Sequence, residues 1–333
     1  MPTQEGNTQV QMSATRPSPA KIKVGVSACL LGQPVRYNGT HKHMPLLTEQ
    51  LARYFEFVPT CPEVGAGMGV PRPPIRLVGD AAAPRAVRVD DASVDFTQPL
   101  QSYAAERIPE LQDLAGYIFI KNSPSCGLFR VKVYLDNGSP GPTPGRGLFA
   151  AALTSAMPLL PVEEDGRLQD PVLRENFITR VFAMHEWQQL CARGLSAATL
   201  IDLHSRYKYT LMAHAPQDYT KLGQLLADAG NHDPAVLGPR YFSGMMQALQ
   251  CKATRKTNTN VLMHLQGYLK KQLQGNEKSS LGNVIEHYRQ GIVPLIVPVT
   301  LLKHYFRVFP DPYINRQAFW QPYPDELSLR NSL

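Results

Sequence analysis

The sequence IKVGVSACLLG at residues 22–32 begins with a short apolar run and reaches a cysteine directly behind it. The same order recurs in FVPTC at residues 57–61 and in YIFIKNSPSC at residues 117–126. Apolar runs of this length, bounded by turn residues, are typical of buried strands. The chain is therefore predicted to place a cysteine at or just beyond the carboxyl end of three separate strands.

Segments with a helical pattern separate these strands, and such alternation is typical of a mostly parallel sheet covered by helices. We therefore predict an α/β domain of the Rossmann-like type. A Gly- and Pro-rich loop at residues 65–74 interrupts the alternation, because proline cannot donate to a strand ladder. The predicted helices lie at about residues 45–56, 95–114 and 147–157, and residues 75–78 and 86–89 predict an edge hairpin.

The second half of the chain has the apolar period of helices. A polar run, Glu163 to Gly166, is interpreted as the break between the two halves. Behind it, apolar residues recur three or four positions apart, which predicts an all-α domain. The helical stripes lie at Leu173–Met184, Val261–Leu273 and Leu281–Tyr288, with Gly275 as the predicted end of the second and Pro298 as the predicted start of a last helix.

Composition limits the class of protein. Of 333 residues, 43% are apolar and 18% are charged, which is ordinary for a globular domain. No stretch approaches the roughly 20 apolar residues of a membrane helix, and the first twenty residues lack the apolar core of a secretory signal. Five cysteines, an odd number, argue against a disulfide framework and favour the cytoplasm. We predict a disordered tail over residues 1–20, an α/β domain over 21–165 and a helical accessory domain over 166–333.

The net charge of +7 lies entirely in the second half. Residues 1–170 hold 16 Lys/Arg and 16 Asp/Glu, whereas residues 171–333 hold 18 and 11. The basic run Lys252–Lys256, with Lys270 and Lys271, is compatible with nucleic-acid binding. A solvated basic face explains the same charges and is the favoured interpretation.

The three strand-end cysteines point to a metal. In an open parallel sheet the carboxyl ends of the strands border one crevice, so Cys29, Cys61 and Cys126 are expected to meet there. None belongs to a C-x-x-C pair, so zinc-ribbon spacing is absent. Three thiolates are one short of the four that saturate an iron–sulfur cluster, which leaves one iron open to a substrate. The alternative is that each cysteine is a small buried apolar residue.

Three motifs resemble those of the thiouracil desulfidase family: VSACLLGQPVRYNG at residues 26–39, CPEVGAGMGVPRPP at 61–74 and KNSPSCG at 121–127. Members remove sulfur from thiolated pyrimidines or their nucleotides, and the resemblance covers about residues 22–162. It implies a [4Fe-4S] cluster held by Cys29, Cys61 and Cys126. The second half, including HSRYKYTLMAH at residues 204–214, resembles a helical domain of unassigned function that recurs fused to such domains.

The resemblance also implies a chemistry. The open iron would bind the thiocarbonyl sulfur and polarise the C–S bond, so that water replaces sulfur without net electron transfer. Glu63, two residues behind a cysteine, is predicted to do the proton work. Ser123 is the second predicted catalytic residue, because the family places a serine three residues before the third cysteine.

The remaining candidates would bind the substrate. Five cations near the crevice would hold a phosphate, Tyr37 would stack on the pyrimidine, and the hydroxyls of Ser27 and Ser125 would contact its polar atoms. The five cations are Arg36, Lys42, Arg72, Arg76 and Lys121.

Together these expectations describe a [4Fe-4S]-dependent desulfidase that converts 4-thiouridine 5′-monophosphate to UMP and hydrosulfide. Two alternatives stay open. One is another enzyme with a three-cysteine cluster, of the hydro-lyase type, and the other is an RNA- or tRNA-directed binding protein with a structural metal. The expected partner is a small thionucleotide or thiobase, with nucleic acid not favoured, no membrane, and an open oligomeric state.

Overall fold

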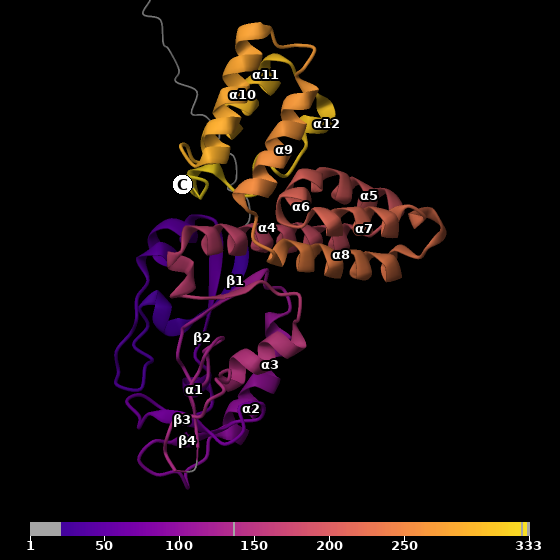
Figure 1. Ribbon diagram of the computed structural model, residues 1–333. Coiled ribbons are helices and arrows are strands. Elements are labelled where there is room, and N and C mark those ends of the chain that lie inside the picture. Colours follow the sequence, from indigo (N-terminus) through magenta and orange to yellow (C-terminus); the bar gives the residue numbers. More distant parts are fainter. Residues whose placement is uncertain (1–20, 136, 328, 332–333) are drawn as a thin grey trace, which may run out of the picture.

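The computed structural model describes residues 21–135, 137–327 and 329–331. The predicted disordered tail, residues 1–20, lies outside the described residues. Figure 1 shows the strands in one part of the molecule, drawn in indigo to magenta, and the later helices in a second part, drawn in orange to yellow. Helix α4 lies along the boundary between the two parts (Figure 1).

The main sheet is parallel and has the strand order β2-β1-β5-β7. Its central strand β1, Ile22–Ser27, is buried on both faces except at Lys23, as expected for a strand covered by helices. The neighbours are β2 (Phe55–Thr60), β5 (Gly116–Phe119) and β7 (Val162–Glu164). The predicted α/β architecture with a mostly parallel sheet is confirmed.

A second, smaller sheet has the order β4-β3-β6. Its strands are β3 (Ile75–Val78), β4 (Arg85–Arg88) and β6 (Val133–Tyr134). The predicted edge hairpin exists, because β3 and β4 pair antiparallel. It is not part of the main sheet, however, since β3 pairs on its other side with β6 and the three strands bury a separate apolar cluster.

The helices of the first part are shorter than predicted. Instead of a helix over residues 45–56 there is one π-helical turn, Leu46–Gln50, and one 3-10 turn, Leu51–Arg53. The strand register explains this, because Phe55 already pairs with the first residue of β1. The helices are α1 (Pro62–Gly65), α2 (Thr97–Arg107) and α3 (Leu148–Ala156), and a 3-10 turn with Pro109 follows α2, since proline cannot continue a helix.

Helix α4, Pro171–Arg193, packs directly on the main sheet. Its Phe177 and Val181 lie over Gly116 of β5, where an added Cβ would be 2.7 Å from the Val181 side chain. The ring of Phe182 lies 5.9 Å from that of Phe55. One apolar core therefore runs from the sheet through α4 into the following helices.

The second part is helical, as predicted. Helices α5 to α8 share the core of α4, and α9 to α12 enclose a second apolar core together with α6. None of the described helices is long and apolar enough to span a membrane. Their bounds are α5 Ala197–Arg206, α6 Lys208–His214, α7 Pro216–Leu226, α8 Pro234–Gln250, α9 Arg255–Tyr268, α10 Gly275–Gln290, α11 Ile296–Val308 and α12 Pro312–Asn315.

Gly275 does not end a helix, contrary to prediction; it begins α10. Helix α9 stops at Tyr268, before the apolar stripe is complete. Leu269 and Leu273 are buried although they lie in the turn between the helices. Apolar residues continue at helical spacing beyond Tyr268, so the sequence pattern alone did not show where the helix ends. Pro298 lies in the first turn of α11, close to its predicted place.

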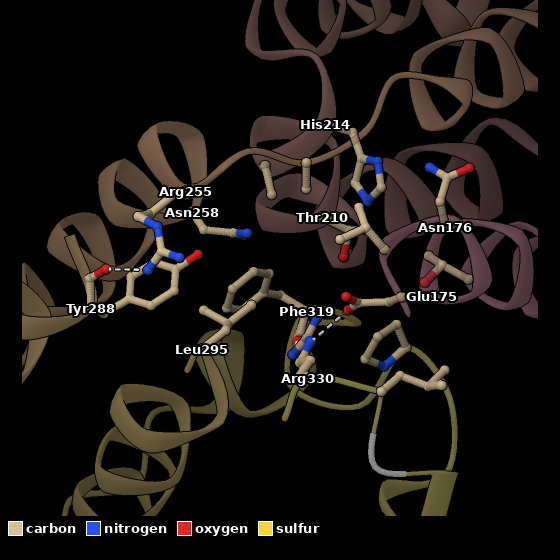
Figure 2. A pocket seen from close by; sticks show the side chains of 16 residues that line it. Glu175, Asn176, Thr210, His214, Arg255, Asn258, Tyr288, Leu295, Phe319 and Arg330 are labelled. Atoms are coloured by element: carbon tan, nitrogen blue, oxygen red, sulfur yellow. Dashed lines mark hydrogen bonds and ion pairs between the residues drawn. The ribbon is translucent and has the colours of Figure 1, made fainter. Parts of the chain in front are cut away.

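A polar cavity of about 140 Å³ lies where α4, α6, α9 and the C-terminal segment meet (Figure 2). Glu175 Oε1 accepts hydrogen bonds from the Tyr323 hydroxyl at 2.6 Å and from Arg330 Nε at 3.1 Å. Arg330 also donates to the Phe319 carbonyl at 2.7 Å. The pair of Glu175 and Arg330, joined in Figure 2, therefore anchors the C-terminal segment to α4.

His204 of α5 makes the helical part sensitive to acid. Its ring stacks on Tyr219 at 4.8 Å between centroids, and burial lowers its pKa to about 4. Because the unfolded state binds the proton at a pKa near 6.5, the free energy of unfolding falls as pH drops from about 6.5 to about 4. Partial exposure limits the loss to the order of 1 kcal/mol.

We expect His204→Gln to flatten this part of the pH profile, measured by urea unfolding at pH 7 and pH 5. The matched control is His264→Gln, at an exposed position of α9, which should leave the profile unchanged. An unchanged slope in His204→Gln would contradict the assignment.

Candidate active site

Three cysteines meet at the carboxyl ends of adjacent parallel strands. Cys29 lies in the 3-10 turn behind β1, Cys61 lies between β2 and α1, and Cys126 lies in the loop behind β5. All three are free and line one cavity of about 470 Å³. Since β2, β1 and β5 are neighbours in the sheet, the topology alone brings the thiols together.

The donor set consists of three thiols around one cavity. Among the described residues, no three His, Cys, Asp or Glu side chains surround one point as the ligands of one metal ion. In a cluster, by contrast, each thiolate binds a different iron, so the ligands are spread around a shared volume. The other two cysteines, Cys191 and Cys251, are exposed and do not line the cavity. Three thiols around one cavity thus fit a cluster with one open iron.

Burial controls the charge of the thiols. It raises the pKa of Cys29 to about 11, with the neighbouring Cys61 thiolate as the next cause. The pKa of Cys61 and that of Cys126 are also raised, again chiefly by burial. A bound metal cation would favour the thiolate forms of these cysteines.

The loop that carries Cys126 is fixed by the first turn of α3. The carbonyl of Pro124 accepts the Leu148 N–H at 3.1 Å, and the carbonyl of Ser125 accepts the Phe149 N–H at 2.9 Å. These bonds satisfy N–H groups that have no partner within the helix. The position of the third thiol therefore depends on the start of α3.

Gly147, which precedes α3, allows this close approach. A Cβ there would lie 2.6 Å from the Ser125 carbonyl carbon and 2.8 Å from the Cys126 nitrogen. We expect Gly147→Ala to lower the free energy of unfolding by about 1–3 kcal/mol through overpacking and to shift the Cys126 loop. Thermal unfolding and iron content after reconstitution measure both effects.

The matched control is Gly267→Ala in α9, where an added Cβ meets no atom within 4 Å. It should be neutral or slightly stabilising. Normal iron retention in Gly147→Ala would show that the loop does not depend on this contact.

The acidic run at Glu163–Asp165, which the sequence placed at the boundary between the two halves, is also part of this site. Its carboxylates are 4–7% exposed, and β7 runs through Glu164. Glu164 Oε1 accepts the N–H groups of Leu128 and Phe129, both at 2.9 Å. Asp165 accepts the Lys121 N–H at 2.8 Å. Glu164 and Asp165 thus hold the backbone on both sides of Cys126, whereas Glu163 pairs with Arg167.

Glu63 lies at the centre of a hydrogen-bond chain. Its Oε2 accepts from Arg72 Nε at 2.9 Å and from Arg72 Nη2 at 2.7 Å. Its Oε1 accepts from the Ser125 hydroxyl at 2.7 Å. Arg72 donates further to the carbonyls of Gly69 and Val35 and is almost fully buried. The guanidinium therefore orients Glu63 and is not available as the phosphate ligand that the sequence suggested.

The two serines extend this chain. Ser123 Oγ accepts the N–H groups of Ser125 and Cys126 and lies 3.0 Å from Ser125 Oγ. Because the Ser125 proton is directed at Glu63, the proton between the hydroxyls must come from Ser123. The network thus runs from Ser123 through Ser125 to the Glu63 carboxylate, directly beside the third thiol.

The other predicted substrate contacts divide into two groups. Ser27, Arg36, Tyr37, Lys42 and Lys121 line the cavity. Ser27 is buried and accepts the Ile120 N–H at 3.0 Å, and Lys42 pairs with Asp165 at 2.8 Å.

Arg76 is the exception. Its guanidinium lies 5.3 Å from the ring centroid of Tyr134, and it is not among the residues that line the cavity. Arg76 lies within β3 and pairs with Val87 of β4, so it belongs to the smaller sheet. The three cysteines of the cavity, by contrast, follow strands of the main sheet.

Sequence reasoning missed Thr60, Asn122 and Asp165. Thr60 and Asn122 line the cavity, and Asn122 has a φ of +60°. Asparagine tolerates the left-handed conformation better than most residues, so its place directly before Ser123 was a usable signal. Asp165 gave no such signal, because a charged residue in an acidic run is indistinguishable from a linker.

Residues 24–165 match the family model described as 2-thiouracil desulfurase. The uncharacterized protein YbbK of Bacillus subtilis (strain 168) is 32% identical over 143 residues, which cover 39% of this chain and 89% of YbbK. The chain belongs to the 2-thiouracil desulfurase family. This confirms the resemblance drawn from the three cysteine motifs.

The family assignment covers the sheet-bearing part of the molecule. Residues 208–324 match a second model, described as a protein of unknown function (DUF1722). The uncharacterized protein YbgA of Escherichia coli (strain K12) is 35% identical over 161 residues, or 47% of this chain and 94% of YbgA. Among solved structures, the [4Fe-4S]-dependent thiouracil desulfidase TudS is 30% identical, with a TM-score of 0.37, covering 45% of this chain and 94% of its own.

Proposed function

We propose that this desulfurase-family protein removes sulfur from 4-thiouridine 5′-monophosphate and releases UMP and hydrosulfide. The main support is a cavity that is lined both by three free thiols and by the hydrogen-bonded side chains of Ser123, Ser125 and Glu63. Thiolates and a proton-transfer group at one place are what C–S bond hydrolysis needs. The proposal extends the family's chemistry to a particular substrate.

Cys29, Cys61 and Cys126 would hold the [4Fe-4S] cluster. When bound, the cluster supplies a Lewis acid with one open iron, to which a soft thiocarbonyl sulfur is matched. All three thiols line the same cavity, so a substrate bound there would present its thiocarbonyl sulfur to the group that they would hold.

Glu63 is the proposed general base. Arg72 holds one carboxylate oxygen through two hydrogen bonds, and the carboxylate would accept a proton from the attacking water. The water oxygen becomes the ring carbonyl oxygen, and sulfur departs as hydrosulfide. The hydroxyls of Ser125 and Ser123 pass a proton between Glu63 and the substrate. Because water replaces sulfur at the same oxidation level, no external electron donor is needed.

The nucleotide is preferred over the free base because cations surround the cavity entrance. Arg36 and Lys121 line it without a carboxylate partner among the described residues, whereas Lys42 and Arg72 are paired to Asp165 and Glu63. These two uncompensated cations favour an anionic substrate over a neutral base. Tyr37, 42% exposed at the same rim, offers a ring face for the pyrimidine.

The test is anaerobic reconstitution followed by iron and sulfide assays and incubation with 4-thiouridine 5′-monophosphate. We expect about four irons per chain and release of sulfide together with UMP. The matched control is the same protein without reconstituted iron. A loaded cluster that turns over no thiopyrimidine would refute the proposal and favour the hydro-lyase alternative, whereas a colourless zinc protein would favour a structural metal.

A further inference from the structure

A second hollow opens beside the cysteine cavity. It has a volume of about 590 Å³ and shares the lining residues Lys121 and Asn122 with that cavity, so the two are adjacent. We call it the cationic hollow. Its charged and aromatic lining residues are Lys121, Phe129, Arg130, Arg146, Glu164 and Arg167.

Its charge is strongly unbalanced. Four cations face a single carboxylate, Glu164, and one oxygen of that carboxylate already accepts two backbone N–H groups. Arg167 pairs with Glu163 outside the hollow at 2.7 Å. Lys121 and Arg130 form no side-chain hydrogen bond or ion pair with the described part of the chain. The hollow therefore keeps a positive charge that the protein does not compensate.

The side chains of Arg146 and Arg167 are held in place. Arg146 donates from Nε to the Leu128 carbonyl at 3.2 Å and from Nη1 to Thr154 Oγ1 at 2.7 Å. The guanidinium of Arg167 lies 5.0 Å from the ring centroid of Phe129, which is 38% exposed. Arg130 has a φ of +55°, a conformation that residues with a Cβ rarely adopt. Oriented cations around an exposed aromatic ring match the needs of a phosphorylated, ring-bearing ligand.

We propose that the cationic hollow is the phosphate-binding subsite for the thiopyrimidine nucleotide, with Lys121 and Arg130 as its phosphate ligands. This inference rests on the proposed function, because it places the base in the cysteine cavity and the phosphate in the adjacent cationic hollow. Lys121 and Arg130 take the place of three phosphate ligands that the sequence suggested, Lys42, Arg72 and Arg76, because those side chains contact Asp165, Glu63 and Tyr134. The phosphate has two possible sources: the 5′-phosphate of a mononucleotide and the phosphodiesters of an RNA strand.

The experiment compares kcat/KM for three substrates with the cluster-loaded enzyme: 4-thiouridine, 4-thiouridine 5′-monophosphate and a short oligoribonucleotide containing 4-thiouridine. The variants are Arg130→Ala and the double variant Lys121→Met/Arg130→Ala. The matched control is Lys132→Ala, an exposed cation that does not line the hollow.

For each protein the measured quantity is the ratio of kcat/KM for a phosphorylated substrate to that for the nucleoside. We expect the ratio to fall about tenfold in Arg130→Ala and further in the double variant. Lys132→Ala should keep the wild-type ratio. A fall for both phosphorylated substrates identifies the mononucleotide phosphate as sufficient. A fall for the oligoribonucleotide alone identifies RNA phosphodiesters as the source.

Two results would overturn the subsite: an unchanged ratio in the double variant, or an equal loss in Lys132→Ala. A second measurement does not depend on turnover, namely calorimetric binding of UMP and uridine. Tighter binding of UMP than of uridine, lost in the double variant, would support the subsite even if no thiopyrimidine were desulfurised, and only the proposed function would then fail. Equal binding of UMP and uridine, together with no preference for the oligoribonucleotide, would exclude the subsite.

Discussion

Replacing Glu63 with glutamine is expected to lower kcat for desulfurisation by about 10²–10⁴-fold, the usual contribution of a positioned general base. Glutamine keeps the size of the side chain and can still accept the Ser125 hydrogen bond, but it cannot take a proton from water. The iron content should stay at the wild-type level, because Glu63 is not one of the three thiol ligands. Activity and iron, measured on the same sample, separate these effects.

The same substitution has a structural cost. Arg72 is 4% exposed at its side chain and Glu63 is its ion-pair partner at 2.7 Å. Removing one member of a buried pair leaves an uncompensated charge and costs about 3–5 kcal/mol. Activity must therefore be compared below the thermal transition of the variant.

Two variants distinguish catalysis from stability. Ser125→Ala removes the hydroxyl between Ser123 and Glu63 but keeps the ion pair, so it should lower kcat with little loss of stability. Glu56→Gln changes an exposed carboxylate on β2 and should change neither property. Wild-type kcat in Glu63→Gln would exclude the carboxylate as the base.

A second large loss is expected after removal of a single thiol. Cys29→Ala, Cys61→Ala and Cys126→Ala should each lower sulfide release by more than about 100-fold, because even the outer partners of metal ligands are worth 10–100-fold. Iron per chain should fall in parallel. The three strands deliver one thiol each, and no fourth cysteine lines the cavity as a substitute.

The chain supplies its own controls for this series. Cys191 and Cys251 are exposed in the helical part, away from the cavity. Cys191→Ala and Cys251→Ala should retain iron and activity, which excludes a general effect of losing a cysteine. Full iron content in any one of the three cavity variants would mean that this thiol is not a ligand.

Sequence reasoning reached the three thiols through topology. Short apolar runs predicted the strands, and parallel strands end at one edge, so the thiols had to meet there. The same reasoning found Glu63 and Ser123, since each follows or precedes a cysteine by only a few residues. Local spacing is sufficient when the residues that act together sit on the same loop or at the ends of neighbouring strands.

Sequence reasoning could not predict which charged residues pair with one another. Arg72, Lys42 and Arg76 all looked like phosphate ligands, and the structure engages them with Glu63, Asp165 and Tyr134. Lys42 and Asp165 are 123 positions apart, and the periodicity of a short segment contains no information on such a distant pair.

By itself, then, the sequence determined which segments become strands, where the thiols emerge and which family the chemistry belongs to. Periodicity and motif spacing are local properties of the chain. The tertiary structure decided which cations remain uncompensated, that Glu164 and Asp165 hold the Cys126 loop, and that α4 continues the core of the sheet. Those outcomes depend on the distance between groups remote in sequence and on their burial, because electrostatic and packing energies depend on both.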